Sequence, residues 1–217
     1  MSTPKEVRVV LIDDHAMVHQ ALASVLGESE DIRVIGQGGD VREALELVEG
    51  LAPDVLVLDY NLPGGGALAV IEHVQRKELA LRILILTVHE NPHYAVRVLE
   101  AGALGFLVKS AAVEELVTAI RAVDRGELYV SSQVSGAVLA QLRRPRSDRS
   151  GALALSDREF ELLRLLAGGL GLSEAAERLS VSVSTASTYR ARMLKKLGLK
   201  TTGELIRYSL ENDLESR

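Results

Sequence analysis

Apolar residues in the first part of the chain fall into short runs, separated by longer stretches with a helical repeat. The runs are almost continuously apolar, which is typical of strands in a parallel sheet covered by helices on both faces. Five such runs predict five strands, at Val7–Ile12, Arg33–Gly36, Val55–Asp59, Arg82–Val88 and Gly105–Val108.

The stretches between these runs predict helices. Apolar positions from 41 to 48 recur at helical spacing behind Asp40, which we expect to be the N-cap of a helix. A similar pattern from 113 to 123 ends before Gly126, the expected stop. Strands alternating with helices predict a doubly wound α/β domain over residues 1–127, with a five-stranded parallel sheet of the flavodoxin-like type.

The pattern changes in the following segment. Residues 143–152 contain four arginines, a proline and small polar residues, a composition typical of a flexible linker. We expect a linker over residues 128–152, with a short helix at Ser131–Leu142. Residues 153–217 show only helical patterns and predict a small all-α domain.

Four helices are expected in this second domain. Ser156 and Glu159 form a capping box that begins the first helix, and Gly168 and Gly169 end it. The other three helices are expected at Ser173–Leu179, Ser184–Leu197 and Thr202–Asn212.

The formal net charge of −5 is unevenly distributed. Residues 1–127 carry 11 basic and 20 acidic side chains (net −9), residues 128–152 carry 4 and 1 (net +3), and residues 153–217 carry 10 and 9 (net +1). Between positions 184 and 203 there are five basic residues and no acidic one: Arg190, Arg192, Lys195, Lys196 and Lys200. Such a cluster is typical of a surface that binds nucleic-acid phosphates, although a solvated helix face has the same composition.

Cysteine content and hydropathy narrow the classes of function. The sequence has no cysteine, which excludes disulfides, thiolate metal sites and cysteine nucleophiles. Its longest apolar runs are strand-sized and too short to cross a membrane. The amino-terminal residues also lack the apolar core of a signal peptide. We therefore expect a cytoplasmic protein with no membrane partner.

Polar residues follow the predicted strands at their carboxyl ends. Asp13 and Asp14 follow the first strand, and Asp59 ends the third. Thr87 and Lys109 lie at the ends of the fourth and fifth strands. Ligands of open parallel sheets bind at this edge, so we expect the five side chains to meet there. Any one of them could instead cap a helix or face solvent, but five such residues at the ends of four strands favour a site.

The chemistry of this set favours phosphoryl transfer. Three carboxylates gathered at one edge need a cation, and oxygen ligands without cysteine favour Mg²⁺ over zinc. A carboxylate beside such a metal can attack a phosphoryl group. We therefore expect Asp59 to be the nucleophile, Lys109 to neutralise the phosphoryl oxygens and Thr87 to donate a hydrogen bond to them.

The segments LIDDH, LDYNLPGGG, LILTVHE and GALGFLVKS resemble the receiver domain of response regulators, and the resemblance covers the first domain from end to end. It implies that Asp59 is the phosphoacceptor and that Asp13, Asp14 and Asp59 hold Mg²⁺. Thr87 would be the switch hydroxyl, and Lys109 would pair with the phosphoryl group.

The same resemblance assigns roles to neighbouring residues. Asn61 would offer its backbone carbonyl to Mg²⁺, and Pro63 would shape the following loop. The side chains of Asn61 and His89 would flank the path of the attacking water and tune dephosphorylation. Phe106 occupies the position of a rotating aromatic residue, which is tyrosine in many members of the family. Without the hydroxyl, rotation of the ring into a cavity and a plain core position both stay open.

The segment from 174 to 197 has the proportions of a helix-turn-helix, with the turn at Ser180–Val183. The second helix of this motif places its N-terminal residues toward base edges in the major groove. The sequence LSDREFELLRLLAGGLGLSEAAERLSVSVSTASTYRARMLKKLGLKTTGEL resembles the LuxR-type helix-turn-helix, and the whole chain resembles the NarL/FixJ class. The resemblance implies DNA contacts from Ser182, Ser184, Thr185, Ser187, Thr188, Arg190, Arg192, Lys195 and Lys196.

The start of the expected recognition helix departs from the family pattern. Members commonly carry lysines flanking a Thr-Val pair, and here Ser184 and Ser187 take those places. Tyr189 replaces a common histidine. With fewer cations near the bases, we expect weak DNA binding by the monomer and a reliance on dimerisation.

These features predict a transcriptional regulator rather than a turnover enzyme. A partner sensor histidine kinase would phosphorylate Asp59, and the resulting homodimer would bind double-stranded DNA with two half-sites. A phosphatase with an aspartyl-phosphate intermediate would need a second acid two residues after the nucleophile, where this chain has Asn61. A DNA-binding regulator whose receiver acts as a non-phosphorylated interaction module is the other alternative.

Overall fold

The computed structural model describes residues 6–63, 65–111, 113–143, 151–212 and 214. Contacts within the chain divide it into two compact units, Met1–Gly136 and Ala137–Arg217. The domain limits derived from the sequence, 1–127 and 153–217, stay predictions. Most of the expected arginine-rich linker, residues 144–150, lies outside the described residues.

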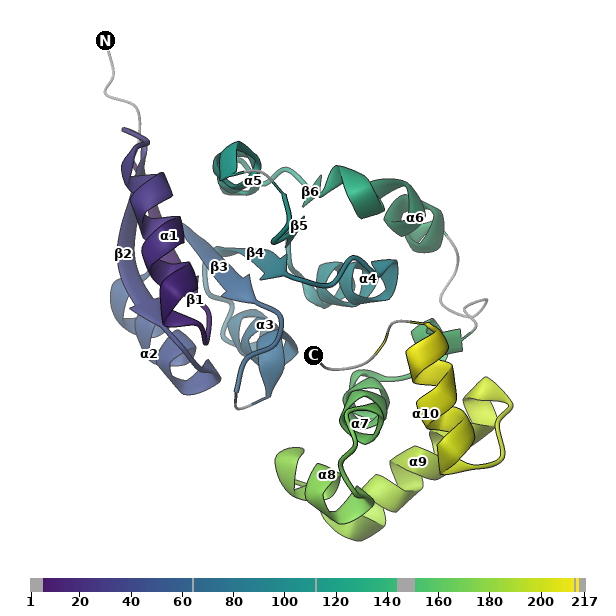
Figure 1. Ribbon diagram of the computed structural model, residues 1–217. Coiled ribbons are helices and arrows are strands. Elements are labelled where there is room, and N and C mark those ends of the chain that lie inside the picture. The colour runs from purple at the N-terminus through teal and green to yellow at the C-terminus, as the bar shows by residue number, and fades with distance from the viewer. Residues whose placement is uncertain (1–5, 64, 112, 144–150, 213, 215–217) are drawn as a thin grey trace. The chain divides into compact units, whose positions relative to one another are not determined.

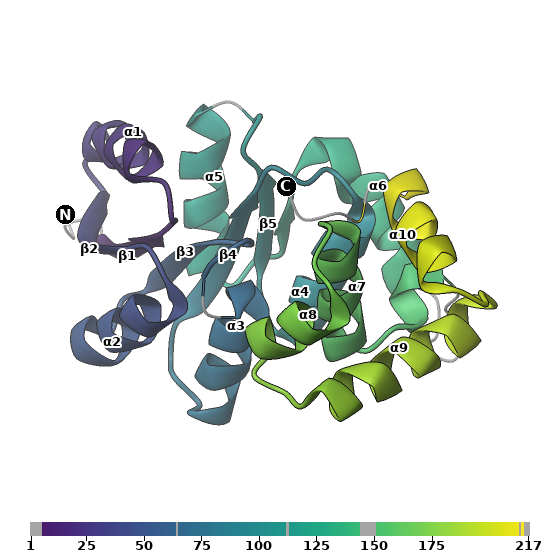
Figure 2. The same ribbon diagram turned by 60° about the horizontal axis from the view of Figure 1, so that its bottom comes forward.

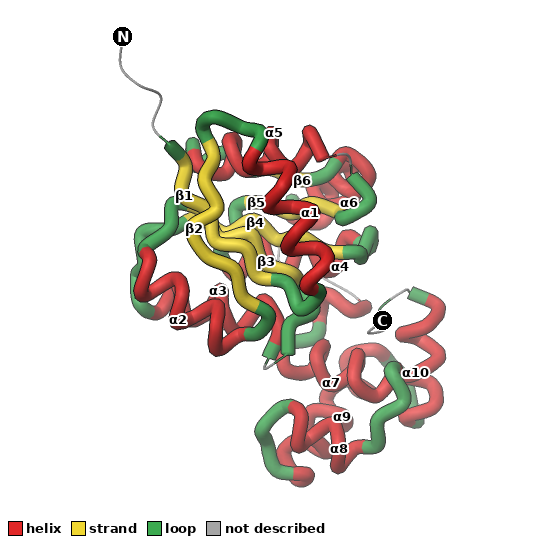
Figure 3. The backbone as a smooth tube through the Cα atoms, turned by 60° about the vertical axis from the view of Figure 1, so that its left-hand side comes forward, coloured by secondary structure: helices red, strands yellow, loops and turns green. Residues whose placement is uncertain are grey.

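A parallel sheet forms the centre of the first unit, which confirms the doubly wound α/β fold (Figures 1 and 3). Its strand order is β2-β1-β3-β4-β5-β6. The bounds are β1 Val7–Ile12, β2 Ile32–Gly38, β3 Val55–Asp59, β4 Arg82–Thr87, β5 Gly105–Val108 and β6 Tyr129–Val130. β1, β3 and β5 agree with the prediction, β2 is longer at both ends, and β4 ends one residue earlier.

The sixth strand corrects the predicted count of five. β6 has only two residues, and Tyr129 and Val130 pair in parallel with Gly105 and Phe106 of β5. So short a strand has no recognisable pattern of apolar positions, and the sequence therefore predicts a linker at these residues. Ser131 continues this junction, because its N–H donates to the Phe106 carbonyl at 2.9 Å.

Helices cover both faces of the sheet. Figure 2 shows α1 and α5 on one side and α2, α3 and α4 on the other. The bounds are α1 Ala16–Gly27, α2 Val41–Leu51, α3 Gly66–Arg76, α4 Pro92–Ala101 and α5 Val113–Asp124. One core cluster joins the odd-numbered side chains of β1, such as Val9 and Leu11, to Leu26 of α1 and Ile120 of α5. Burial on both faces explains why the strands are almost continuously apolar.

Capping residues fix where several of these helices begin. Asp40 is the N-cap of α2, as predicted, and its carboxylate accepts from the Glu43 N–H at 2.8 Å. Asn91 is the N-cap of α4, with Pro92 at the first helical position. Gly126 follows α5 with a φ of 79°, a conformation that glycine adopts without strain and that suits a helix stop.

Helices are the only regular secondary structure among the described residues of the second unit. A 3-10 helix at Gly151–Ala154 precedes α7 Asp157–Ala167, α8 Leu172–Arg178, α9 Val183–Leu197 and α10 Thr202–Glu211. The predicted capping box is present at α7: Glu159 N–H donates to Ser156 Oγ, and Ser156 N–H donates to the Glu159 carboxylate. α8 and α9 each begin one residue earlier than predicted, because Gly171 and Ser182 are their N-caps. α10 ends one residue earlier, at its C-cap Asn212.

The helix expected between the two domains is α6, Ser132–Leu142. It begins one residue after the predicted start, because Ser131 belongs to the junction with β5. None of the helices in the described part of the chain is both long enough and apolar enough to cross a membrane.

Candidate functional site

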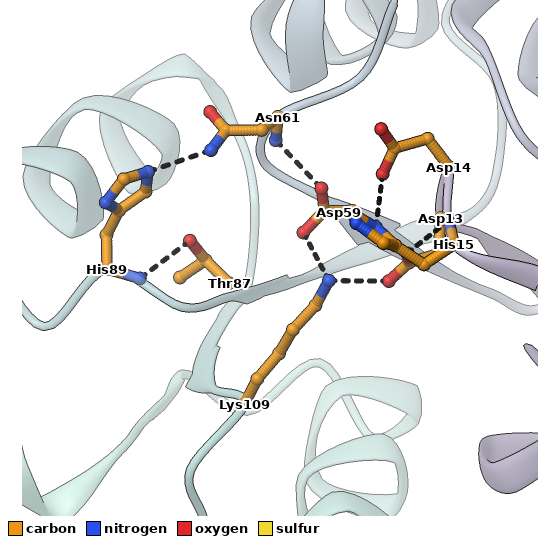
Figure 4. A network of polar contacts seen from close by, with 8 residues as sticks. All are labelled: Asp13, Asp14, His15, Asp59, Asn61, Thr87, His89 and Lys109. Carbon is orange, nitrogen blue, oxygen red and sulfur yellow. Dashed lines mark hydrogen bonds and ion pairs between the residues drawn. The ribbon is translucent and has the colours of Figure 1, made fainter. Parts of the chain in front are cut away.

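The carboxyl edge of the sheet gathers the residues that the sequence singled out (Figure 4). Asp13 follows β1, Asp59 ends β3, Thr87 ends β4 and Lys109 follows β5. Asp13, Asp59 and Thr87 are 2%, 5% and 1% exposed, so the sheet and its helices withdraw these polar groups from water. Two carboxylates buried this close to each other require a positive partner.

Lys109 supplies that positive charge. Its Nζ lies 2.6 Å from Asp13 Oδ2 and 2.9 Å from Asp59 Oδ1, so one ammonium bridges the ends of two strands. Burial would lower the pKa of Lys109, but its hydrogen bonds to Asp13 and Asp59 raise the pKa by more. The three residues form one coupled charge cluster.

Asp59 keeps a raised pKa in spite of this ammonium. Burial is the main cause, and the hydrogen bond from Lys109 opposes it without reversing it. The other carboxylate oxygen, Oδ2, accepts from the Asn61 N–H at 3.1 Å. A buried carboxylate that is costly to ionise is a common feature of a functional site.

Asp14 and His15 lie at the more exposed side of the cluster. His15 Nδ1 is 2.7 Å from Asp14 Oδ1 and 3.3 Å from Asp13 Oδ1. Among the described residues, Asp13, Asp14 and His15 can each place one ligand atom within 4.8 Å of the others. No sequence-based prediction includes His15, although it directly follows two aspartates in the chain.

The donor chemistry of this edge fits Mg²⁺. Asp13, Asp14 and Asp59 provide hard carboxylate oxygens, and Mg²⁺ is commonly held by a few such oxygens together with water. Asp14, whose side chain is 34% exposed, leaves the cluster open to solvent on one side. The backbone carbonyl of Asn61 as a further ligand stays a prediction.

Thr87, His89 and Asn61 form a second set of contacts beside Asp59 (Figure 4). Thr87 Oγ1 accepts from the His89 N–H at 3.1 Å, which leaves the hydroxyl proton of Thr87 available for donation. Asn61 Nδ2 lies 2.9 Å from His89 Nε2, and because an amide nitrogen only donates, the ring nitrogen accepts. The His89 ring is also stacked on Tyr94, with ring centroids 4.3 Å apart.

Phe106 lies apart from these polar contacts. It is fully buried in β5, three residues before Lys109, and its neighbour Leu107 faces the core that α1 and α5 cover. Its ring therefore points to the opposite face of the sheet. This position is compatible with a core residue and with a ring that moves.

In the second unit, α8 and α9 form the predicted helix-turn-helix, with a left-handed residue, Ser180, in the turn. Three of the hydroxyl residues expected to contact DNA make bonds within α9. Ser182 Oγ accepts from the Thr185 N–H at 3.0 Å and lies 2.8 Å from Thr185 Oγ1. Thr188 Oγ1 donates to the Ser184 carbonyl at 3.0 Å.

The basic residues of α9 are placed differently from one another. Arg192 and Lys195 are exposed and Arg190 is half-buried. Lys196 donates from Nζ to Glu159 Oε2 at 2.6 Å, and Glu159 is only 2% exposed. Lys196 therefore makes an ion pair between α7 and α9. This pair has no signal in the sequence pattern, since its partners are 37 residues apart in the chain.

Comparisons with known proteins agree with this geometry in both units. Residues 9–121 match the response regulator receiver domain, and residues 153–209 match the luxR family of bacterial regulatory proteins. Response regulator UvrY of Escherichia coli strain K12 is 31% identical over 208 residues, covering 96% of this chain and 95% of its own length. Oxygen regulatory protein NreC of Staphylococcus carnosus is 33% identical over 213 residues, covering 95% and 98%.

Solved structures with the same architecture include RcsB of Salmonella typhimurium. One is 27% identical with a TM-score of 0.77, covering 95% of this chain and 98% of its own. Another, described as bound to the promoter P1flhDC in the presence of phosphomimetic BeF₃⁻, is 28% identical with a TM-score of 0.74 and covers 94% and 98%.

Proposed function

Because the chain belongs to the NarL/FixJ class of two-component response regulators, with a receiver domain and a LuxR-type helix-turn-helix domain, we propose that phosphorylation of Asp59 switches its binding to DNA. The observation that carries this proposal is the position of the Lys109 ammonium, within 2.9 Å of both Asp13 and Asp59. It places a fixed positive charge where a phosphoryl group on Asp59 would need one.

The phosphoryl donor is a phosphohistidine of a partner sensor histidine kinase. The N–P bond of the phosphohistidine breaks, a P–O bond forms to a carboxylate oxygen of Asp59, and the histidine nitrogen keeps the electron pair. Asp13, Asp14, Asp59 and the carbonyl of Asn61 hold Mg²⁺, which when bound neutralises phosphoryl oxygens.

The switch follows from the contacts that change when Asp59 carries a phosphoryl group. The Thr87 hydroxyl donates to a phosphoryl oxygen, and Lys109 exchanges its bond to the carboxylate for one to the phosphoryl group. Both residues lie at the ends of strands that continue into the surface of α4 and α5. Movement of β4 and β5, which carries Phe106 of β5 with it, alters that surface and favours a homodimer.

The homodimer binds double-stranded DNA at two half-sites, one for each α9, in the cytoplasm. This proposal is supported by the LuxR-type match over residues 153–209 and by the promoter-bound RcsB structures. The exposed cations Arg192 and Lys195 provide phosphate contacts, and Arg190 assists them.

The test is the intact mass of the full chain after incubation with Mg²⁺ and a small acyl-phosphate donor. We expect a gain of one phosphoryl group, mapped to the peptide that contains Asp59, and no gain when EDTA removes the metal. No adduct under conditions that load another receiver domain would leave a phosphorylation-independent DNA-binding regulator in place of this proposal.

Replacing Asn61 and His89 together with alanine is expected to lengthen the lifetime of the phosphorylated protein by about five-fold. The two side chains contact each other beside Asp59 and can orient the attacking water, and one such hydrogen bond contributes about 1 kcal/mol. The decay of the adduct in mass spectra measures the lifetime. An unchanged lifetime would refute this role.

Lys196→Met is expected to lower the free energy of unfolding by about 2 kcal/mol, because Glu159 loses the cation that neutralises its buried carboxylate. Burial raises the pKa of Glu159, but the hydrogen bonds from Lys196 and Ser156 lower it by more. The pKa of Glu159 is therefore below its ordinary value of 4.5. A lowered folded-state pKa stabilises the protein above pH 4.5, and this contribution is lost as the pH falls below that value. Urea unfolding at neutral and acidic pH should therefore show a difference that disappears in acid.

Lys195→Met provides the matched control for DNA binding. It should flatten the slope of log affinity against log salt by about 0.9, as expected for one lost phosphate contact, whereas Lys196→Met should leave the slope unchanged. Equal changes in both variants would mean that Lys196 contacts phosphate rather than supporting α9 through Glu159.

A further inference from the structure

The outward face of α9 is defined by the residues that are buried on its other side. Ala186 and Met193 are fully buried and fix the direction of the core. At about 100° per residue, the positions opposite to them are 184, 188, 191 and 195. The residues there are all exposed: Ser184, Thr188, Ala191 and Lys195.

Two of these residues present methyl groups. The Thr188 hydroxyl is turned back onto the helix, where it donates to the Ser184 carbonyl at 3.0 Å, so its methyl group is free to face outward. Ala191, three residues further along the same face, offers only a methyl group. Side chains three apart on a helix are neighbours, so Thr188 and Ala191 form one small apolar step, which we call the methyl pair.

The rest of this face limits how bases can be read. Long side chains that bond bidentately to guanine or adenine are arginine, lysine, asparagine and glutamine, and positions 184, 188 and 191 carry none of them. Lys195 is more than two turns from the N-terminus of α9, toward the end that lies outside the groove in a helix-turn-helix. Between the Ser184 hydroxyl at one end of the face and Lys195 at the other, the groups at positions 188 and 191 are methyl groups.

We propose that the methyl pair, Thr188 and Ala191, determines sequence specificity by contacting the C5-methyl groups of thymine in the major groove. Alanine and the threonine methyl are side-chain groups that suit this contact, and thymine is the base that presents a methyl there. The inference rests on the proposed DNA binding and names the base that the second unit recognises. Ala191 is not among the residues for which the sequence predicts a contact with DNA.

The test uses uracil, which differs from thymine only by the missing methyl group. Double-stranded DNA is first selected from a random library by the full chain in the presence of Mg²⁺ and BeF₃⁻, and each thymine of the selected site is then replaced by deoxyuridine. We expect one position in each half-site where the replacement weakens binding about four-fold, the effect of one buried methyl group, and about sixteen-fold when both half-sites are changed.

Thr188→Ser identifies the protein side of the contact, since serine keeps the hydroxyl and lacks the methyl. In this variant, or in Ala191→Gly, binding should no longer distinguish thymine from uracil at the sensitive position. Thr202→Ser, the same change on α10, should distinguish them as the wild type does. Circular dichroism of each variant checks that α9 remains helical.

Two results would overturn the inference, and they differ in what they say of the proposed function. A selected site to which the wild type binds equally well with uracil at every position would refute the methyl contact while DNA binding stands. Failure to enrich any sequence would refute the proposed function and the inference with it.

Discussion

Asp59→Asn is expected to abolish phosphorylation of this protein completely while leaving the receiver unit folded. The amide has the shape of the carboxylate and keeps an oxygen to accept from the Asn61 N–H, but it cannot attack phosphorus. Burial raises the pKa of Asp59, so the ionised carboxylate destabilises the fold at neutral pH. Its removal should therefore leave the melting temperature unchanged or raise it, and lost phosphorylation cannot be ascribed to unfolding.

Asp54→Asn is the matched control, because Asp54 precedes the other end of the same strand, β3. There its carboxylate accepts from the Arg8 N–H at 2.9 Å, away from the acidic cluster. Intact mass after incubation with the phosphodonor should show one phosphoryl group on this variant and none on Asp59→Asn. An adduct that persists in Asp59→Asn would place the acceptor elsewhere.

Lys109→Met is expected to lower the free energy of unfolding by about 3 kcal/mol at neutral pH, because two buried carboxylates lose the ammonium between them. The ion pairs raise the pKa of Lys109 above 10.5, so they stabilise the wild type below that pH for as long as the two carboxylates stay ionised. At acidic pH, the difference in unfolding free energy between Lys109→Met and the wild type should become smaller, since a protonated Asp59 no longer repels Asp13. Urea unfolding without added metal, at pH 7 and pH 4, measures both effects.

Lys77→Met is the control for this change. Lys77 lies at the end of α3 with its side chain 54% exposed and 3.7 Å from Glu49, a solvent-screened surface pair that should contribute little to stability. If Lys109→Met were no less stable than Lys77→Met, the charge cluster would not hold the strand ends together. Lys109→Met should also accept a phosphoryl group more slowly, because a neutral side chain cannot stabilise the transferring group.

The sequence predicts those parts of the fold that have a regular pattern of apolar positions or a recognisable capping residue. β1 and β3 are buried on both faces, so their apolar runs matched the strands to the residue. Local capping chemistry likewise located the starts of α2 and α7, at Asp40 and Ser156. β6 is too short to have a repeat, and its pairing with β5 depends on how residues distant in the chain meet.

In the candidate site, too, local patterns are predictable from the sequence and contacts between distant residues are not. The strand-end rule brought Asp13, Asp59 and Lys109 to one edge, because parallel strands all end on the same side. The positions of the strand ends do not predict contacts between side chains of neighbouring helices. Pairing of Lys196 with Glu159 depends on how α7 packs on α9, which the sequence pattern does not show, and a DNA contact from Lys196 stays a prediction. The bond from the Thr188 hydroxyl to the Ser184 carbonyl likewise depends on the side-chain rotamer in the folded helix.

The central claim is that a phosphoryl group on Asp59 controls DNA binding. It is tested most directly by the dissociation constant of the selected DNA site for wild type and Asp59→Asn, each measured with Mg²⁺ alone and with Mg²⁺ and BeF₃⁻. We predict that BeF₃⁻ tightens binding by the wild type by about 5- to 150-fold, the usual range of coupling between two sites, and has no effect on the variant. Equal affinity for the wild type under both conditions would contradict the account, and would mean that the receiver does not control DNA binding through Asp59.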